Sequence, residues 1–417
     1  MHKYFQLIWT AIKAKPRQFI LAILVVFIFP LFIKLYTYFD HENKYDKVGL
    51  NTFDFTSKSF NKTKKLPDFI RNDKFRKVFK WINFQQIENY KFEFQHNFPK
   101  CPLCKYQIQS NPNAPKRDDS YDISLSFLMG NISGVVPYIQ TLRSTGSKAQ
   151  IVIFVDDETG ETIYLKTGSF MKDCGVHIIN IGNIPKNNNC RYFVLNYVKY
   201  AASLLFLQTH PFFDRVLVTD LSDVIFQGNP FLAVFPNNET FISSPEYENN
   251  GIQTSHWYEE ETEIEILKML TEIRKDVSFH SFRRKESYYN SGVFLTTYHL
   301  AVSHFFNVFD LLNDITHSQW DRLEELNEKL EETNVNIYAI NTYLKKNNSI
   351  TVLNDGLNNE LFLLTGRQYE KGQQFPNFKY KGNYVLLFHL VHLDKEYCNS
   401  ISQKCSPIFD FTPYYHC

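Results

Sequence analysis

Two carboxylates near the middle of the chain have the spacing of a metal-binding pair. Asp220 and Asp223 lie three residues apart, directly after the apolar run 216–218. Such oxygen ligands suit a hard divalent cation such as Mg²⁺ or Mn²⁺, which proteins commonly bind through a few carboxylates together with substrate phosphates. An aspartate after a strand can also simply form a turn or cap a helix. These residues alone leave both interpretations open.

The pattern of apolar residues around the two acids predicts a mixed α/β fold. Apolar segments typical of strands alternate with amphipathic segments typical of helices, which indicates a mostly parallel sheet flanked by helices. Ligands bind such sheets beyond the carboxyl ends of the strands, where Asp220 lies. We predict strands over 123–130, 149–155, 176–181, 215–219, 240–244 and 383–388. We predict helices over 133–145, 160–173, 191–208, 258–275 and 317–333. A polar turn predicted at 289–292 enters a further strand, which is followed by a helix ending near 313.

An uncharged apolar segment near the N-terminus predicts a membrane anchor. Residues 19–33 contain no charged side chain, and with Leu35 and Tyr36 the run approaches the roughly 20 residues that span a bilayer. Basic residues precede this run and acidic residues follow it, so the positive-inside rule places the short N-terminus in the cytosol. A cleaved signal peptide is the alternative, although no small-x-small cleavage site follows the run.

These features predict a single-pass type II membrane protein whose folded body is lumenal. Four N-x-S/T triplets, which would accept glycans in a lumenal chain, agree with this orientation. The net charge of +1 argues against a nucleic-acid partner, because non-specific binding to nucleic acid needs clustered cations. We predict a cytosolic tail over 1–18, a transmembrane anchor over 19–36, a lumenal stem over 37–118 and a folded domain over 119–417.

All seven cysteines follow the predicted anchor, so an oxidising compartment would allow them to pair. Cys101 and Cys104 form a Cys-x-x-Cys pair, which alone supplies too few ligands for a zinc site. We therefore expect a disulfide there, either local or long-range. Cys398 and Cys405 are expected to form a second disulfide near the C-terminus.

The order of these elements resembles that of nucleotide-sugar-dependent glycosyltransferases of the GT-A fold, especially the family 8-like group and its Golgi relatives. The resemblance covers about residues 120–395, most of the predicted lumenal domain. It rests on the opening strand 121–130, Asp156 and Asp157 at a strand end, Arg191 at a helix start, the block 218–227, the turn 290–293 and His389 after the last strand.

The resemblance implies a metal site and a donor site. Asp220 and Asp223 would hold Mn²⁺ or Mg²⁺, which grips the diphosphate of a nucleotide-sugar donor, and His389 would be the third metal ligand. Arg191 would contact the nucleotide or pyrophosphate, and Asp156 the base or ribose. The catalytic wall on the sugar and acceptor side would be Asn290, Ser291 and Gly292, where glycine allows close backbone approach.

The function that the resemblance implies is transfer of a hexose-type sugar to a glycan or glycoprotein in the lumen of the Golgi or ER. Two departures from the family pattern support an alternative, a catalytically inactive GT-A domain that binds glycans or acts as a membrane-anchored scaffold. Leu221 and Ser222 separate the acids where relatives often carry Asp-x-Asp or Asp-Ser-Arg-Asp, and Asn336 stands where relatives often carry an acid. A metal-dependent phosphohydrolase is a weaker alternative, because it usually needs more ligands.

Each of the other candidate residues also has a purely structural interpretation. His389, like the nearby His392, could be a hydrogen-bonded packing residue. Asp156 could cap the helix that follows it. Asn290 could shape a turn, and Arg191 could form a surface salt bridge.

Overall fold

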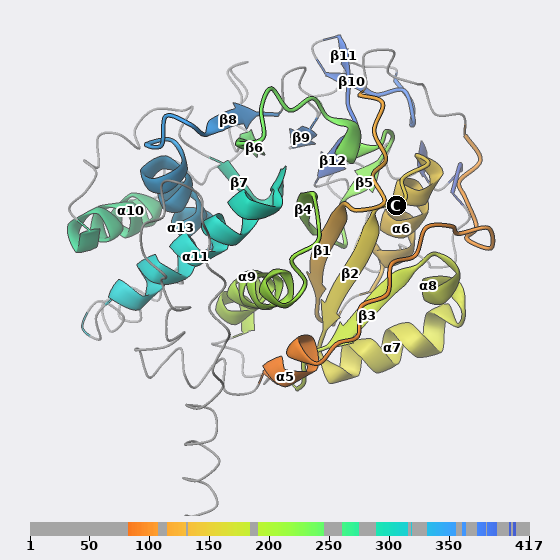
Figure 1. Cartoon of the computed structure of the whole chain (residues 1–417), viewed down its shortest axis with the longest axis horizontal. Coiled ribbons are helices and arrows are strands. Elements are labelled where there is room, and N and C mark those ends of the chain that lie inside the picture. Colours follow the sequence, from red (N-terminus) through yellow and green to blue (C-terminus); the bar gives the residue numbers. More distant parts are fainter. Residues whose placement is uncertain are drawn as a thin grey trace, which may run out of the picture. The chain divides into compact units, whose positions relative to one another are not determined.

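The computed structural model is built around one central sheet with helices on both of its faces (Figure 1). The described residues all belong to the unit Pro67–Cys417. Within them no helix is long and apolar enough to cross a bilayer, and the predicted tail and anchor lie outside the described ranges. The structure describes residues 82–106, 115–130, 132–183, 191–245, 261–274, 289–315, 318, 332–355, 361–363, 373–380, 382–389, 400–401 and 403–405.

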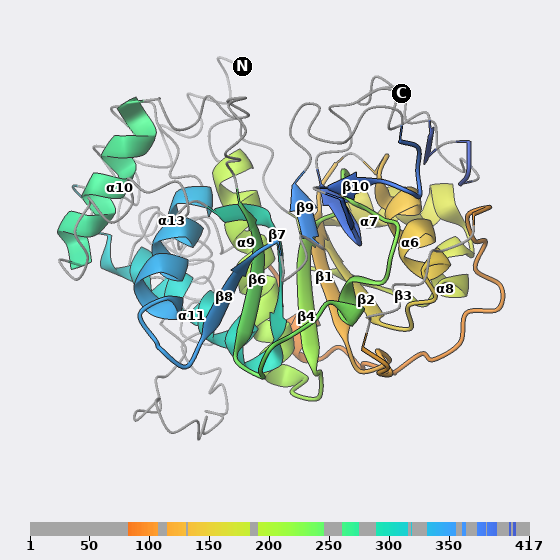
Figure 2. The same cartoon turned by 90° about the horizontal axis from the view of Figure 1, so that it is seen from above.

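A seven-stranded sheet forms the centre of the fold, with the strand order β3-β2-β1-β4-β7-β6-β8 (Figure 2). Only β7 runs antiparallel to its neighbours, so the predicted mostly parallel sheet is confirmed. The strands are β1 (Ile123–Leu128), β2 (Gln150–Val155), β3 (Val176–Asn180), β4 (Arg215–Asp220), β6 (Thr240–Pro245), β7 (Tyr289–Thr297) and β8 (Thr351–Asn354).

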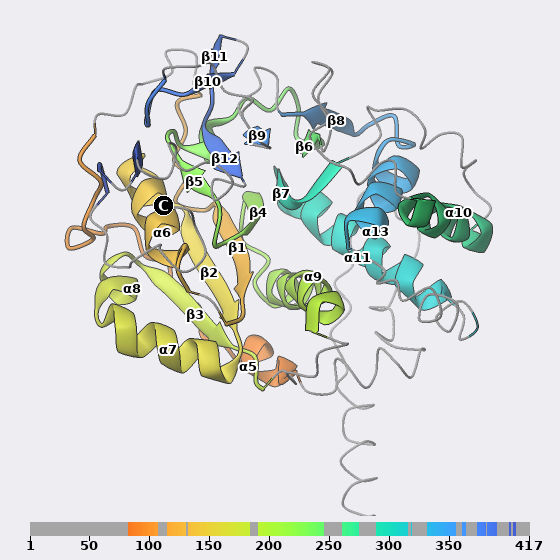
Figure 3. The same cartoon turned by 180° about the vertical axis from the view of Figure 1, so that it is seen from behind.

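The chain order of the strands creates a switch point between β1 and β4. From β1 the chain steps outward to β2 and β3, and it then returns to the other side of β1 as β4. Right-handed crossovers therefore place α6 (Val135–Ser144) and α7 (Asp157–Thr167) on one face and α9 (Arg191–Thr209) on the other. Figures 1 and 3 show α6 and α9 on opposite sides of β1 and β2.

Burial on both faces explains why the central strands are continuous apolar runs. Leu217 and Leu295 join a core cluster with α6, α7 and the short α8 (Phe170–Asp173). On the opposite face, Phe294 packs against Phe305 of α11 (Tyr298–Asp314), with 5.8 Å between ring centroids.

Further helical elements of the described residues are α10 (Glu261–Arg274), α13 (Glu332–Ala339) and the π-helical turn η6 (Ile340–Leu344).

The structure differs from the prediction at several elements, and the sequence analysis did not predict the strand β8. The helix predicted over 160–173 is two helices, because Gly168 interrupts it with a φ of 55°. The late strand predicted over 383–388 is also two pieces, β11 (Asn383–Tyr384) and β12 (Leu387–His389). The turn predicted at 289–292 is wrong, because this segment is the start of β7: Tyr289 lies opposite Pro245 of β6, and a register irregularity separates this pair from the regular pairing that begins at Val293.

A smaller sheet stands beyond the end of β4 and is built from three distant parts of the chain (Figure 1). Its order is β5-β12-β9, with β5 (Ile225–Phe226) antiparallel to β12 and β9 (Leu361–Leu363) parallel to β12. A hairpin of β10 (Lys379–Tyr380) and β11 lies between β9 and β12 in the chain.

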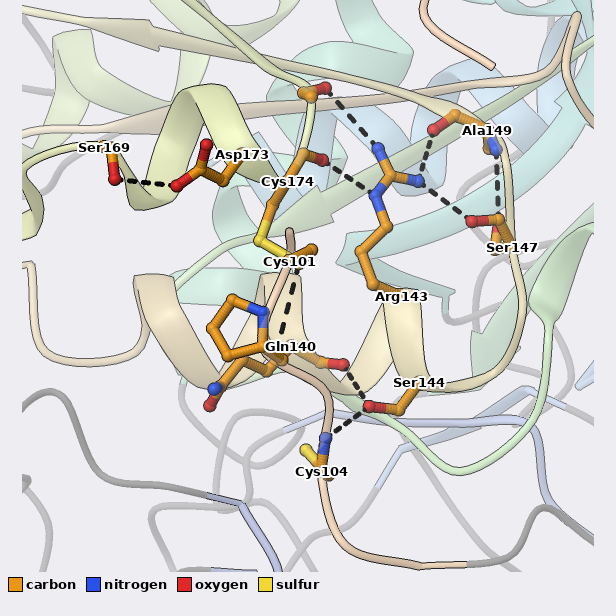
Figure 4. Close-up of a disulfide and its surroundings, with 12 residues drawn as sticks. Cys101, Cys104, Gln140, Arg143, Ser144, Ser147, Ala149, Ser169, Asp173 and Cys174 are labelled. Atoms are coloured by element: carbon orange, nitrogen blue, oxygen red, sulfur yellow. Dashed lines mark hydrogen bonds between the residues drawn. A yellow bond between two sulfur atoms is a disulfide. The ribbon is translucent and has the colours of Figure 1, made fainter. Parts of the chain in front are cut away.

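Residues 82–106, which the sequence assigned to the stem, are part of the folded body. Ile87 of α5 (Phe84–Glu88) is fully buried, and two disulfides, Cys101–Cys174 and Cys104–Cys405, tie this segment to the rest. Figure 4 shows Cys101–Cys174 beside the buried Arg143. The prediction that Cys101 and Cys104 form disulfides is confirmed, and of the two forms left open the structure shows the long-range one. The predicted Cys398–Cys405 pair is wrong, because Cys405 pairs with Cys104.

Candidate metal centre

Asp220 stands at the carboxyl edge of the sheet, at its switch point. It is the last residue of β4 and lies in register with Phe127 near the end of β1. The backbone in front of it is held by a buried hydroxyl network, in which Thr219 Oγ1 lies 2.9 Å from Ser126 Oγ and 2.8 Å from the Tyr138 hydroxyl. A rigid strand end therefore presents the Asp220 carboxylate beyond the sheet.

The pairing of β5 with β12 brings His389 to the two acids. Ile225 follows Asp223 by two residues and lies opposite Phe388 in antiparallel register. The next residue of β12, His389, therefore lies beside the chain that carries Asp223. A ligand about 170 residues away in sequence is placed by a two-residue strand, which explains why this sheet matters to the site.

Asp220, Asp223 and His389 converge closely enough to share one cation. His389 Nε2 lies 3.5 Å from Asp220 Oδ2 and 3.5 Å from Asp223 Oδ1. One potential ligand atom from each of the three residues falls within 4.8 Å of the others. The side chain of His389 is 3% exposed and that of Asp220 is 43% exposed, so the centre has a buried wall and an open side.

This donor set fits a divalent cation. Two carboxylates and an imidazole are accepted by Mn²⁺ and other first-row cations, whereas Ca²⁺ prefers oxygen ligands alone. The open side at Asp220 leaves room for substrate oxygens or water to complete the coordination. The sequence predicted all three residues, and the structure brings them together.

Lys199 is a site residue that the sequence analysis missed. It projects from α9, is 3% exposed, and its Nζ lies 2.8 Å from Asp220 Oδ1. Burial raises the pKa of the Asp220 carboxyl, but the Lys199 ammonium and His389 lower it more, so the pKa of Asp220 lies below its usual range. A lysine inside an otherwise apolar helical stretch is the signal that could have revealed it, because lysine is almost never fully buried unless paired.

The strand β7 supplies the neighbouring wall of the centre. Gly292 lies where the β4–β7 register places it beside Asp220. A Cβ at Gly292 would be 2.5 Å from His389 Cε1 and closer than van der Waals contact to Asp220 Oδ2. Position 292 therefore requires glycine, because the backbone of β7 lies too close to Asp220 and His389 for a side chain, as the sequence suggested.

Asn290 and Ser291 lie next to Gly292 but use their polar groups within the protein. Asn290 Oδ1 accepts a hydrogen bond of 2.8 Å from the Gly292 N–H. Ser291 Oγ lies 2.9 Å from Thr333 Oγ1 of α13. Both residues are less than 10% exposed, so they shape the wall of the centre from behind.

Asn336 is fully buried behind this wall. Its Nδ2 donates to the Asn290 carbonyl at 3.4 Å, and its Oδ1 lies 2.8 Å from His304 Nε2. Burial lowers the pKa of His304 to about 4, although the hydrogen bond to Asn336 raises this pKa by a smaller amount. His304 is therefore neutral at pH 7 and donates its Nε2 proton to the amide oxygen.

The lowered pKa of His304 predicts a loss of stability in acid. The folded chain favours neutral His304, so this stabilisation is complete above the unfolded pKa of about 6.5 and disappears as the pH falls towards 4. His177, whose pKa burial also lowers to about 4, adds to the effect. The fall in unfolding free energy between pH 6.5 and 4 should be smaller in His304→Gln, as measured by denaturant unfolding. An identical pH dependence in the two proteins would contradict this prediction.

The remaining predicted residues lie elsewhere or outside the described parts. Asp156 caps α7, where its Oδ1 accepts a 3.0 Å hydrogen bond from Thr159 N, at the same sheet edge but two strands from β4. Arg191 begins α9, and its side chain lies outside the described residues. His392 is also outside them.

Gly134 is a second residue that the sequence analysis did not identify. It precedes α6, and a Cβ there would overlap the carbonyl of Ser222, between the two acids. The start of α6 therefore packs directly on the loop that carries Asp223. Its signal in the sequence is weak, because a glycine before a helix is common.

Fold and site together define a mixed α/β protein with a candidate divalent-metal centre at the carboxyl edge of its sheet. In comparisons with known proteins, no family model and no curated sequence matches the chain. The case for a particular activity therefore rests on the geometry of this centre.

Proposed function

We propose that this protein is a metal-dependent glycosyltransferase of the GT-A type. It transfers a hexose-type sugar from a nucleotide-diphosphate donor to a glycan or glycoprotein. The observation that carries the proposal is the convergence of Asp220, Asp223 and His389 at the switch point of a mostly parallel sheet. Such switch points are where open α/β sheets bind nucleotides.

Sugar transfer requires stabilisation of the negative charge that develops on the leaving diphosphate. A cation held by Asp220, Asp223 and His389 would neutralise that charge as a Lewis acid. Lys199 places a second positive charge within 2.8 Å of Asp220, on the wall formed by α9. It would assist charge neutralisation on the phosphate oxygens, and it partly fills the role of the arginine that relatives carry between their acids.

The wall formed by β7 would border the sugar. Gly292 leaves space beside Asp220 and His389, so a donor can approach the backbone closely. Asn290 and Ser291 hold that backbone through Gly292 N–H and Thr333. We therefore propose that these two residues position the reacting centre.

A lumenal location remains part of the proposal. Two long-range disulfides are typical of an oxidising compartment. With the predicted anchor at 19–36, they support a type II protein of the Golgi or ER membrane.

The proposal is tested with the full-length protein in detergent and a panel of nucleotide sugars. We expect Mn²⁺-dependent hydrolysis or transfer with at least one donor, and loss of turnover in Asp223→Asn. Absence of turnover with every donor, in protein that is folded and binds Mn²⁺, would favour the inactive GT-A domain. The buried Asn336–His304 pair supports that second candidate, because no acid stands at this position.

Replacing Lys199 with methionine is expected to weaken binding of the donor diphosphate about 10- to 150-fold, because a charged hydrogen bond contributes roughly 1.5–3 kcal/mol. Methionine keeps the length of the side chain within α9. Calorimetry with a nucleoside diphosphate and Mn²⁺ measures the change. Lys172→Met, on the distant α8, is the matched control. Equal affinity of the two variants would contradict the role of Lys199.

A further inference from the structure

We propose that the Cys104–Cys405 disulfide positions the metal ligand His389, so that the metal centre is complete only in the oxidised protein. The inference rests on the metal site of the proposed function, but it does not depend on sugar transfer. It concerns a covalent link between residues 301 apart in sequence. The effect would be transmitted by packing through the apolar cluster that the two cysteines share with β5 and β12.

The disulfide belongs to the small core that supports the β5–β12 pair. Both cysteines are buried in one apolar cluster with Ile225 of β5 and Phe388 of β12. Those two residues lie directly opposite each other in the β5–β12 register. Phe388 immediately precedes His389, and Ile225 follows Asp223 by two residues. The cluster therefore fixes the spacing between the ligands.

Hydrogen bonds connect the disulfide-bearing segments to the same small sheet. Lys105 N donates to the Lys404 carbonyl at 2.6 Å, next to the disulfide. The Tyr106 hydroxyl donates to the Phe226 carbonyl of β5 at 3.2 Å. Cys104 N donates to Ser144 Oγ of α6 at 2.7 Å. Residues 104–106 thus bridge the C-terminal segment, β5 and α6.

A second set of contacts would hold the segments that precede β12 against the chain after β5 without the disulfide. Gln227, fully buried after β5, donates through Nε2 to the Phe378 carbonyl at 2.6 Å and to the Val385 carbonyl at 2.5 Å. Gln227 N also donates to the Leu386 carbonyl at 3.0 Å. Loss of the disulfide is therefore expected to loosen His389 and leave the protein folded.

Reduction by a dithiol such as dithiothreitol would open this link. Two electrons and two protons pass to the cystine sulfurs, the S–S bond breaks, two thiols form, and the reductant becomes a cyclic disulfide. The segments around Cys104 and Cys405 are then joined only by non-covalent contacts. In the denatured chain the link also restricts a very long loop, so its loss lowers the unfolding free energy as well.

The other disulfide is a natural control. Cys174 precedes β3, and Arg143 binds the Cys174 carbonyl at 2.9 Å and the Ala149 carbonyl, just before β2, at 2.8 Å (Figure 4). Cys101–Cys174 therefore lies at the amino edge of the parallel strands, whereas the metal centre lies at the carboxyl edge. Its loss should reduce stability without moving His389.

Full-length Cys104→Ser/Cys405→Ser and Cys101→Ser/Cys174→Ser proteins test the inference, with Mn²⁺ alone titrated by electron paramagnetic resonance. We expect about tenfold weaker Mn²⁺ binding in the first variant and unchanged binding in the second. In a His389→Gln background the first pair of substitutions should have no further effect. Equal Mn²⁺ affinity in both variants, or an undiminished loss in the His389→Gln background, would overturn the inference.

Partial reduction of folded wild-type protein covers the case in which the serine variant does not fold. Mn²⁺ release should follow the appearance of Cys104 and Cys405 thiols, mapped by alkylation, while circular dichroism remains constant. Release that follows only the loss of circular dichroism would overturn the inference. Mn²⁺ binding without turnover would instead count against the glycosyltransferase proposal alone.

Discussion

Asp220→Asn is expected to reduce metal-dependent turnover by about 10²–10³-fold or more, because removal of one preorganised electrostatic stabiliser typically costs that much. The substitution removes one anionic ligand and also the charge partner of Lys199, whose Nζ lies 2.8 Å from Asp220 Oδ1. Asparagine still accepts a hydrogen bond from Lys199. We therefore expect the fold to persist with a modest loss of stability, about 1 kcal/mol.

Turnover and Mn²⁺ affinity should be measured together with thermal unfolding. Asp173→Asn is the matched control, because Asp173 is an acid on α8 whose carboxylate accepts an exposed hydrogen bond of 2.7 Å from Ser169 Oγ. This control should keep full Mn²⁺ affinity. If Asp220→Asn binds Mn²⁺ with wild-type affinity, Asp220 is not a ligand of the metal centre.

Gly292→Ala is expected to weaken Mn²⁺ binding by about 100-fold. The new Cβ would overlap Asp220 Oδ2 and lie 2.5 Å from His389 Cε1, so both ligands must move apart. Gly292 is part of the nine-residue strand β7, which pairs on both sides and cannot easily retreat. Overpacking of this kind costs typically 1–3 kcal/mol of stability. Calorimetric titration with Mn²⁺ and thermal unfolding measure the two effects.

Gly160→Ala supplies the comparison for this variant. Gly160 lies within α7, and a Cβ there would be 3.2 Å from Val155 Cγ2 and far from the three ligands. Alanine favours a helix interior by about 1 kcal/mol over glycine, which offsets that contact. If Gly292→Ala and Gly160→Ala bind Mn²⁺ equally well, the close approach of β7 to the ligands has no functional meaning.

Local sequence patterns were sufficient to predict most strands of the central sheet and the two acids, but not the edge strand β8. The runs that form β2 and β4 are apolar because both of their faces are covered, and this signal is visible in any short window. Asp220 is the last residue of β4, so its place at the carboxyl edge depends on one strand boundary.

Long-range pairing is the part that the sequence could not reveal. The segment 290–292 looks like a turn because it contains Asn, Ser and Gly, yet it lies within β7, between Tyr289, which pairs with Pro245, and Val293, which pairs with Thr219. Lys199 reaches Asp220 only through the packing of α9 on the sheet. The partner of Cys104 is likewise invisible, because cysteine spacing does not determine connectivity.

The central claim is that Asp220, Asp223 and His389 hold a cation that binds a donor diphosphate. Titration of the full-length protein with Mn²⁺, followed by electron paramagnetic resonance with and without UDP, tests it most directly. We expect one Mn²⁺ per chain, tighter binding when UDP is present, and loss of both effects in His389→Ala/Asp223→Asn. Mn²⁺ binding that UDP leaves unchanged, or that survives in this variant, would contradict the claim.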